Sequence, residues 1–321
     1  MRPHARIPRV SVAAAVDLSV NVGALRLSNP ILAASGTFGY GVEFAQLVDL
    51  NRLGGIVVKG LSLEPIAGAP APRLCETASG MLNAVGLQNV GVRAFVAEKL
   101  PALRQYHTAV VANVFGYTVD DYVGVIRILE ESEGLAAYEL NISCPNTSHG
   151  GLQFGSDPQM VSEVVSAARS AAVRRPLWVK LSPNVTDIGI IARAAAEAGA
   201  DALTVANTYQ AMSIDVQTRK SRLGRLTGGL SGPAIKPITL RLVYEARRAV
   251  KIPVIGLGGI EKADDVLEYI IAGASAVEVG TANFSAPTAC LDILDRLEIA
   301  CRASNINKIS SLIGSFQADC P

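Results

Sequence analysis

Residues 139–146 read Glu-Leu-Asn-Ile-Ser-Cys-Pro-Asn, and Thr-Ser-His-Gly-Gly follows directly at 147–151. The segment 136–142 is predicted to be a buried strand that runs out into a loop whose first polar groups are an amide, a hydroxyl and a thiol. Pro145 ends the strand, and the two glycines leave the following loop free to open and close over a ligand. Because packing alone explains a thiol poorly at this place, Cys144 is the first candidate for chemistry.

The same succession of apolar strand, loop and helix repeats eight times along the chain. The predicted strands cover 30–34, 55–59, 108–113, 136–142, 177–182, 202–207, 253–257 and 276–280. The predicted helices cover 42–50, 91–103, 119–132, 158–173, 187–198, 234–250, 262–272 and 287–300. Eight such units favour an α/β fold of the (β/α)8 TIM barrel type over an open doubly wound sheet. Alternating apolar and polar residues at 17–29 predict an N-terminal β-hairpin that could plug one end of the barrel.

The chain has 321 residues, of which 50% are apolar, so it can bury one large core. We expect a loose N-terminal arm at 1–16, a single catalytic domain at 17–302 and a tail at 303–321. The net charge of +1 gives no bulk attraction to nucleic acid or to an anionic membrane. No apolar run approaches the ~18 residues that cross a bilayer, and the first apolar piece is too short for a secretory signal. These features predict a cytoplasmic protein.

Five cysteines are spread along the chain without a Cys-x-x-Cys pair, and there are only three histidines. This pattern argues against a disulfide framework, a structural metal site and an iron–sulfur cluster held by this chain alone. Cys75, Cys290 and Cys301 are expected to be small buried apolar residues. Cys144 differs, because a free thiol has a pKa of roughly 8.5 and a small shift makes it a competent base near neutrality.

Chemistry in a (β/α)8 barrel sits at the C-terminal edge of the strands. The eight predicted strands end there in polar groups or glycines, namely Ser35, Lys59, Asn113, Asn141 with Cys144, Lys180 with Ser182, Asn207 with Thr208, Gly258 with Gly259, and Gly280 with Thr281. A single polar strand end usually just meets water. Several amides, two lysines and a thiol at one mouth favour a functional site.

Lys59 and Lys180 each close a strongly apolar strand, and an unpaired buried ammonium is costly. One lysine could neutralise the electron-rich edge of a reduced flavin, and the other could hold an oxygen of the substrate or cofactor. The alternative is a Schiff base, for which a desolvated barrel lysine is the usual nucleophile.

Glycine-rich segments at 256–260 and 280–283 follow the last two strands, where barrels of this class commonly bind phosphate through backbone N–H groups. A Cβ there would keep phosphate oxygens away from the amides. No Gly-x-Gly-x-x-Gly opens an early unit, which argues against a Rossmann dinucleotide site.

Two connections, 60–90 and 209–230, are longer than a strand-to-helix loop needs to be, and such loops are usually functional. The first could place Asn83 and backbone groups over a ligand. The second carries four basic residues, which we interpret as a solvated hairpin rather than an anion site: Arg219, Lys220, Arg222 and Arg225.

Four motifs together resemble the dihydroorotate dehydrogenase family, in particular the catalytic subunits of its class 1B, NAD-linked bacterial type. They are Asn-Ile-Ser-Cys-Pro-Asn at 141–146 with His-Gly-Gly at 149–151, Lys-Leu-Ser-Pro-Asn-Val-Thr-Asp at 180–187, Thr-Gly-Gly-Leu-Ser-Gly-Pro at 227–233 and Gly-Leu-Gly-Gly at 256–259. The similarity runs from about 18 to 297.

The resemblance implies that FMN lies across the barrel mouth and accepts a hydride from C6 of dihydroorotate, while Cys144 takes the C5 proton. It implies FMN contacts at Ser35, Lys59, Gly60, Asn113, Asn141, Lys180, Ala206, Gly232, Gly258, Gly259, Gly280 and Thr281. It implies substrate contacts at Lys59, Asn83, Ala84, Val85, Gly86, Leu87, Asn141, Asn207 and Thr208. It also places the reaction, oxidation of dihydroorotate to orotate, in de novo pyrimidine biosynthesis.

In class 1B enzymes, electrons pass to a second subunit that carries FAD and a [2Fe–2S] cluster, and then to NAD. The resemblance therefore implies a homodimer of catalytic subunits within a heterotetramer of two catalytic and two electron-transfer subunits. Membrane-bound relatives use a serine base and a quinone-binding N-terminal helix, both of which this sequence lacks.

Three other functions fit parts of the sequence. A dihydropyrimidine dehydrogenase domain would reduce uracil, and an aldolase would form a Schiff base on Lys59 or Lys180. A non-enzymatic flavin-binding subunit would hold FMN that dihydroorotate fails to bleach.

Overall fold

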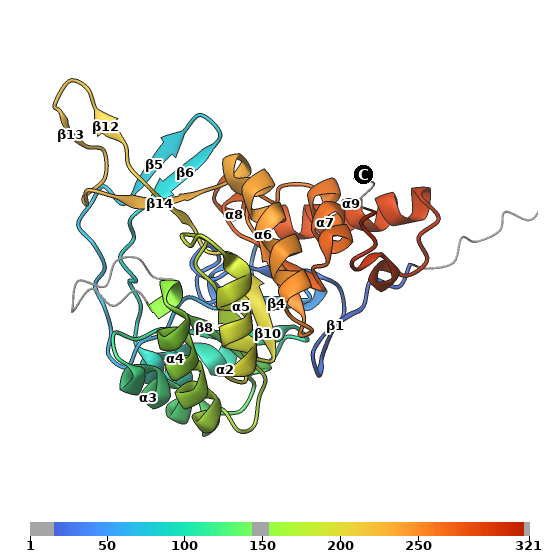
Figure 1. Ribbon diagram of the computed structural model, residues 1–321, viewed down its shortest axis with the longest axis horizontal. Helices are drawn as coiled ribbons and strands as arrows, with labels where there is room; N and C mark the ends of the chain where they lie inside the picture. The colour runs from blue at the N-terminus through green and yellow to red at the C-terminus, as the bar shows by residue number, and fades with distance from the viewer. Residues whose placement is uncertain (1–15, 143–153, 318–321) are drawn as a thin grey trace, which may run out of the picture.

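The computed structural model describes residues 16–142 and 154–317, and eight parallel strands in it close into a barrel (Figure 1). Around the barrel the strands follow the order β10, β15, β16, β3, β4, β7, β8, β9. Their bounds are β3 Ile31–Ala33, β4 Gly55–Val57, β7 Ala109–Val114, β8 Ala137–Asn141, β9 Leu177–Lys180, β10 Ala202–Val205, β15 Val254–Leu257 and β16 Ala276–Val279. The predicted (β/α)8 barrel is confirmed, and all eight strands lie where the sequence pattern predicts them.

Helices follow seven of these strands and cover the outside of the barrel (Figure 1). They are α1 Val92–Ala94, continued by a π-helical turn at Phe95–Lys99 and α2 Leu100–Leu103, then α3 Val119–Glu130, α4 Pro158–Ala171, α5 Ile188–Glu197, α6 Lys236–Ala249, α7 Ala263–Ala272, α8 Ala282–Ser285 and α9 Ala289–Ala303. Local sequence determines where several of these helices begin. The side chains of Thr118, Asp157 and Asp187 accept hydrogen bonds from backbone N–H groups in the first turns of α3, α4 and α5.

The helix predicted at 42–50 is wrong. The structure has two short 3-10 turns instead, Val42–Phe44 and Leu50–Arg52. Gly41 precedes the first turn with φ 92° and caps it with no side chain, while the Asp49 side chain accepts from Asn51 N and begins a second turn. A chain that restarts at an Asp cap cannot continue the same helix, because the cap residue takes an extended conformation.

The predicted N-terminal hairpin is confirmed as the antiparallel pair β1 Val20–Val22 and β2 Leu25–Leu27. Its turn residue, Gly23, lies close to the carbonyl of Asp201, which precedes β10. The hairpin therefore covers the N-terminal end of the barrel, and Val22 and Leu27 are buried there. The opposite, C-terminal end of the strands stays available for a site.

The chain after α9 returns to the barrel. Asp17 N donates to Asn307 O at 2.9 Å, and Ile309 N donates back to Asp17 O at 3.0 Å. Ile309 is fully buried, and Phe316 N donates to Ile271 O near the end of α7. These contacts attach the C-terminal segment to both the N-terminal segment and α7.

The two long connections combine into a second sheet over the barrel mouth (Figure 1). Its strand order is β11 Tyr209–Ala211, β14 Gly228–Ser231, β6 Gly80–Asn83 and β5 Leu74–Thr77, all antiparallel. Beyond it projects the hairpin of β12 Ile214–Asp215 and β13 Lys220–Ser221. Arg219, Lys220 and Arg222 are exposed on or beside this hairpin, which confirms the solvated-hairpin interpretation for these three, while Arg225 is half-buried.

Within the two described ranges, none of the helices is both long and apolar enough to cross a membrane.

Candidate active site

A pocket opens at the C-terminal edge of the barrel strands, under the second sheet. Every residue that the sequence predicted for cofactor or substrate contact lines it, from Ser35 after β3 to Thr281 after β16. Cys144 and His149 lie outside the described residues. Asn141, the last residue of β8, lines the pocket and precedes Cys144 by three positions in the sequence.

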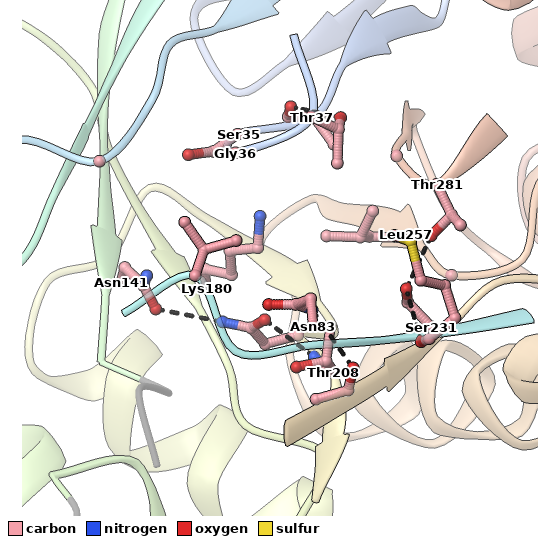
Figure 2. Close-up of a pocket in the computed structure, with 18 of the residues that line it drawn as sticks. Ser35, Gly36, Thr37, Asn83, Asn141, Lys180, Thr208, Ser231, Leu257 and Thr281 are labelled. Carbon is pink, nitrogen blue, oxygen red and sulfur yellow. Dashed lines mark hydrogen bonds between the residues drawn. The ribbon is translucent and has the colours of Figure 1, made fainter. Parts of the chain in front are cut away.

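Figure 2 shows the segment Ser35 to Thr37 on one side of the pocket and Asn83 and Thr208 on the other. Asn207 Nδ2 donates to Asn141 Oδ1 at 3.2 Å, and Thr208 N donates to Asn207 Oδ1 at 2.8 Å. Asn83 Nδ2 donates to the carbonyl of Gly229 at 3.2 Å, which joins the two long connections at the pocket. Amides from three separate parts of the chain are thus held together on this side.

Several pocket residues escaped the sequence prediction. Met81 and Ser231 face each other in the pairing of β6 with β14, and Ser231 Oγ accepts from Thr281 Oγ1 at 2.8 Å. Phe115 and Phe284 add aromatic walls. Ser231 and Met81 reach the pocket only because two distant loops pair, which no local pattern signals.

At the pocket floor, Lys180 lies between two buried glutamates. Its Nζ is 3.2 Å from Glu278 Oε2 and 3.5 Å from Glu139 Oε1, and both glutamates are fully buried. Thr204 Oγ1 donates to Glu139 Oε2 at 2.7 Å. The sequence reasoning missed both acids. The signal that could have found them is a carboxylate in the middle of an otherwise apolar barrel strand, since such a charge needs a partner.

The charge states of Lys180, Glu139 and Glu278 depend on one another. Burial and the neighbouring Glu139 charge raise the pKa of Glu278 well above its ordinary value. Burial opposes the charge on Glu139 too, but Lys180 and several hydrogen bonds outweigh it and lower the pKa of Glu139. Burial alone would lower the pKa of Lys180, yet the two carboxyl groups raise it. Lys180 is therefore a cation balanced by Glu139, with the proton on Glu278, and it is unsuited to be a Schiff-base nucleophile.

Glu139 also fixes the amide of Asn113. Asn113 Nδ2 donates to Glu139 Oε1 at 2.7 Å, so its Oδ1 is the end left for the pocket. That oxygen is buried and has no hydrogen-bond partner among the described residues. A Cβ on Gly60 would come within 2.9 Å of it, so glycine keeps the approach open. Buried acceptors rarely stay unpaired, which points to an N–H group of a bound ligand.

Lys59 lines the same pocket in a different electrostatic setting. Burial first, and the nearby Arg73 charge second, lower the pKa of Lys59. Across 16–142 and 154–317, no acceptor lies within hydrogen-bonding distance of its Nζ and no acid pairs with it. A partly buried ammonium in a ligand pocket, without a protein acceptor, is suited to an anionic ligand group.

The glycines after β15 and β16 serve two different purposes. A Cβ on Gly258 would clash with Thr239, and one on Gly259 would clash with Gly232 O and Lys236, so these glycines make room for protein. A Cβ on Gly280 would meet only ordinary contacts with pocket residues, so this glycine alone keeps space for a ligand. The backbone N–H groups of Gly259, Gly280 and Thr281 donate to no acceptor in the described part of the chain.

A family model described as "Dihydroorotate dehydrogenase" matches residues 17–300. The chain is 59% identical over 301 residues to a protein of Solibacter usitatus that is named, provisionally, dihydroorotate dehydrogenase A (fumarate), covering 94% of this chain and 99% of that one. It is 54% identical over 300 residues to the "Dihydroorotate dehydrogenase B (NAD(+)), catalytic subunit" of Trichlorobacter lovleyi, covering 94% and 98%.

A crystal structure of the Eimeria tenella enzyme in complex with ferulenol superposes with a TM-score of 0.79 at 25% identity, covering 93% of this chain and 88% of that one. The same barrel is therefore kept at low sequence identity. The resemblance seen in the sequence motifs is confirmed across nearly the whole chain, and relatives of the NAD-linked type are among the similar proteins. The chain belongs to the dihydroorotate dehydrogenase family.

Proposed function

We propose that this protein oxidises dihydroorotate to orotate in pyrimidine biosynthesis, with FMN as its flavin. The observation that carries the proposal is the pocket itself, in which the ammonium of Lys59, without an acceptor among the described residues, lines the same space as Asn83, Asn141 and Asn207. A ligand with both a carboxylate and a ring of alternating N–H and C=O groups matches this donor set.

FMN fits the other half of the pocket. The N–H groups of Gly259, Gly280 and Thr281, which have no acceptor in the described part of the chain, are suited to a phosphate after the seventh and eighth strands. Asn113 Oδ1, which no described residue pairs, is suited to an N–H of the flavin ring, and cationic Lys180 to a ring edge that gains negative charge. Bound FMN would supply the hydride acceptor of the reaction.

The substrate would be held from the second-sheet side. Lys59 would bind its carboxylate, while Asn83, Asn141, Asn207 and Thr208 would bind its ring, together with the turn at Ala84, Val85, Gly86 and Leu87. Leu87 adopts φ 60° and Gly86 φ 75°, so this turn presents backbone groups in a conformation that a regular strand does not. The remaining predicted contacts to FMN are Ser35, Gly60, Ala206, Gly232 and Gly258.

Cys144 would be the base that removes the C5 proton. Its role comes from the family motif at 141–146, and the position of Asn141 on the pocket rim supports it. Lys180 stays protonated and so competes poorly as a base for this step. A cysteine near neutral pH needs only a small pKa displacement to accept a proton.

We propose that electrons leave through a second subunit carrying FAD and a [2Fe–2S] cluster and then reach NAD, in a cytoplasmic heterotetramer built on a homodimer of catalytic subunits. Similar proteins named as catalytic subunits of the NAD(+) enzyme support a partner. The Solibacter usitatus relative carries fumarate in its name, so fumarate is the alternative electron acceptor.

The test is a visible spectrum of the purified chain before and after anaerobic addition of dihydroorotate. We expect a flavin spectrum that dihydroorotate bleaches. A colourless protein trapped by borohydride with a carbonyl substrate would indicate the aldolase, and turnover of uracil without bleaching by dihydroorotate would indicate a dihydropyrimidine dehydrogenase. A flavin that no pyrimidine bleaches would indicate a binding subunit.

The electron acceptor is tested on the bleached protein. We expect NAD+ alone to leave the flavin reduced, because the proposed route needs the FAD and iron–sulfur subunit. Rapid return of the colour on adding fumarate would contradict the partner proposal and place the chain with the fumarate-linked type.

A further inference from the structure

A buried tyrosine hydroxyl lies behind the Gly258–Gly259 peptide. Tyr269 Oη, from α7, donates to the carbonyl of Gly258 at 2.7 Å, and the Tyr269 side chain is fully buried. Both glycines line the pocket, so the hydroxyl contacts the opposite, core-facing side of the peptide. Burial raises the pKa of Tyr269, which keeps the hydroxyl protonated and therefore a donor.

The hydrogen bond sets the direction of an amide. The carbonyl of Gly258 and the N–H of Gly259 belong to one peptide unit, and this unit is trans, since the cis bonds within the described ranges are at 71–72 and 205–206. In a trans unit the two groups point in opposite directions. When Tyr269 holds the carbonyl toward the core, the Gly259 N–H is directed toward the pocket, where no group in residues 16–142 or 154–317 accepts it.

The loop is shaped around this tyrosine. A Cβ on Gly256, inside β15, would lie 2.5 Å from Cδ1 of the Tyr269 ring. A Cβ on Gly258 would lie 2.9 Å from Thr239 Oγ1, and Gly259 takes φ +65°. Glycine at 256 therefore makes room for the ring. Two successive glycines at 258 and 259 leave the peptide between them free to rotate unless something holds it.

We propose that Tyr269 is a positioning residue that holds the Gly258 carbonyl so that the Gly259 N–H points at the phosphate of FMN. The inference rests on the proposed function, because the phosphate belongs to the proposed cofactor. It adds a residue with no contact to the pocket space, which acts through one peptide unit of the loop after the seventh barrel strand.

The test compares two flavins that differ by the phosphate alone. The full-length chain, stripped of flavin, is titrated with FMN and with riboflavin, and binding is followed by flavin fluorescence. For Tyr269→Phe we expect the Kd for FMN to rise about tenfold, the effect of roughly one hydrogen bond to a charged group, while the Kd for riboflavin stays within about twofold.

Tyr138→Phe is the matched control. Tyr138 is also fully buried, and its hydroxyl accepts from Arg175 Nη1 at 2.8 Å, but it lies near the start of β8 and away from the pocket. We expect this variant to lower the melting temperature without changing the Kd ratio of the two flavins.

Unchanged FMN affinity in Tyr269→Phe would overturn the inference. An equal loss of FMN and riboflavin affinity would also overturn it, because it would indicate a general structural role. If the wild-type chain bound neither flavin, the proposed function would fail and this inference with it, which the wild-type titration shows before any variant is made.

Discussion

At the scale of single residues, the carboxyl pair under Lys180 limits the charge that the pocket floor can hold. Two ionised glutamates beside one ammonium would leave a net negative charge, and the burial of Glu139 and Glu278 makes that costly. Retention of one proton by Glu278 removes the imbalance. The floor of the pocket then carries one cation and one anion.

The pH dependence of stability tests this arrangement. The pKa of Glu278 is raised in the folded state, so its contribution is fully present below the ordinary value of 4.5 and is lost as the pH rises toward the folded value. Glu278→Gln has no proton to lose. We therefore expect the melting temperature of this variant, relative to wild type, to increase between pH 5 and pH 8. The increase should be about 2–4 °C for each kcal/mol of stability that the wild-type protein loses.

Glu139→Gln is the contrasting variant. The pKa of Glu139 is lowered in the fold, so its contribution is present above 4.5 and is lost as the pH falls through the lowered value. This variant should be least stable, relative to wild type, near neutral pH and should approach wild type in acid. Parallel pH profiles for both variants would show that the two glutamates do not share one proton.

Cys144 is the proposed base for the C5 proton. We expect Cys144→Ala to keep the flavin spectrum and to slow bleaching by dihydroorotate by a factor of about 10²–10⁴, the usual contribution of a positioned base. Cys301→Ala is the control, because Cys301 is fully buried in α9, far from the pocket residues. Stopped-flow absorbance measures both. If dihydroorotate bleaches Cys144→Ala as fast as wild type, Cys144 is not the base.

At the scale of elements, the second sheet determines which residues lie over the barrel mouth. Pairing of β14 with β6 sets Gly229 opposite Asn83, and pairing of β14 with β11 sets Leu230 opposite Tyr209, next to Thr208. The predicted substrate contacts in the two long connections are therefore placed by one sheet. Their spacing depends on strand register, which a bulky residue in β14 would disturb.

Gly229→Ala tests this dependence. A Cβ at Gly229 would lie 2.0 Å from Thr208 Oγ1, so the two strands must separate. Because overpacking of this kind costs about 1–3 kcal/mol, we expect the KM for dihydroorotate to rise at least about fivefold. FMN affinity should change less, since the proposed phosphate contacts Gly259, Gly280 and Thr281 follow β15 and β16 rather than β14. Steady-state kinetics and flavin titration measure the two effects, and equal losses in both would count against a substrate-side role.

At the scale of the whole molecule, the C-terminal segment joins the two ends of the described chain. Ile309 is fully buried, and its N–H bonds to Asp17, at the start of the N-terminal hairpin. The proposed boundary at 302 implies that the segment beyond it adds little to the catalytic domain. Because Ile309 is buried and hydrogen-bonded, we expect the segment beyond 302 to contribute measurably to the stability of the domain.

Ile309→Ala should lower the free energy of unfolding by about 2–5 kcal/mol, the usual cost of removing a buried aliphatic side chain. Ser311→Ala is a suitable control, since Ser311 is exposed in the same turn. Urea denaturation of the two variants gives the comparison. An effect below about 0.5 kcal/mol for Ile309→Ala, the range of ordinary surface substitutions, would support a boundary at 302.

The barrel was predictable because its strands and helices carry strong local periodicity. Seven helices and all eight strands follow the sequence pattern. The exception, 42–50, failed because the apolar residues there suit a helix while Gly41 and Asp49 divide the segment into two turns. The pocket residues at strand ends were predictable for a related reason, since a parallel barrel brings all C-terminal ends to one rim.

The amino-acid sequence by itself determined the fold class, the family and the rim residues, because these depend on patterns and motifs that lie close together along the chain. Tertiary structure alone decided the second sheet, the Glu139–Glu278 pair around Lys180 and the contact of Tyr269 with Gly258, which join residues separated by 11 to 150 positions. Such contacts depend on strand register and on which side of a barrel strand faces inward, and closure of the barrel fixes both.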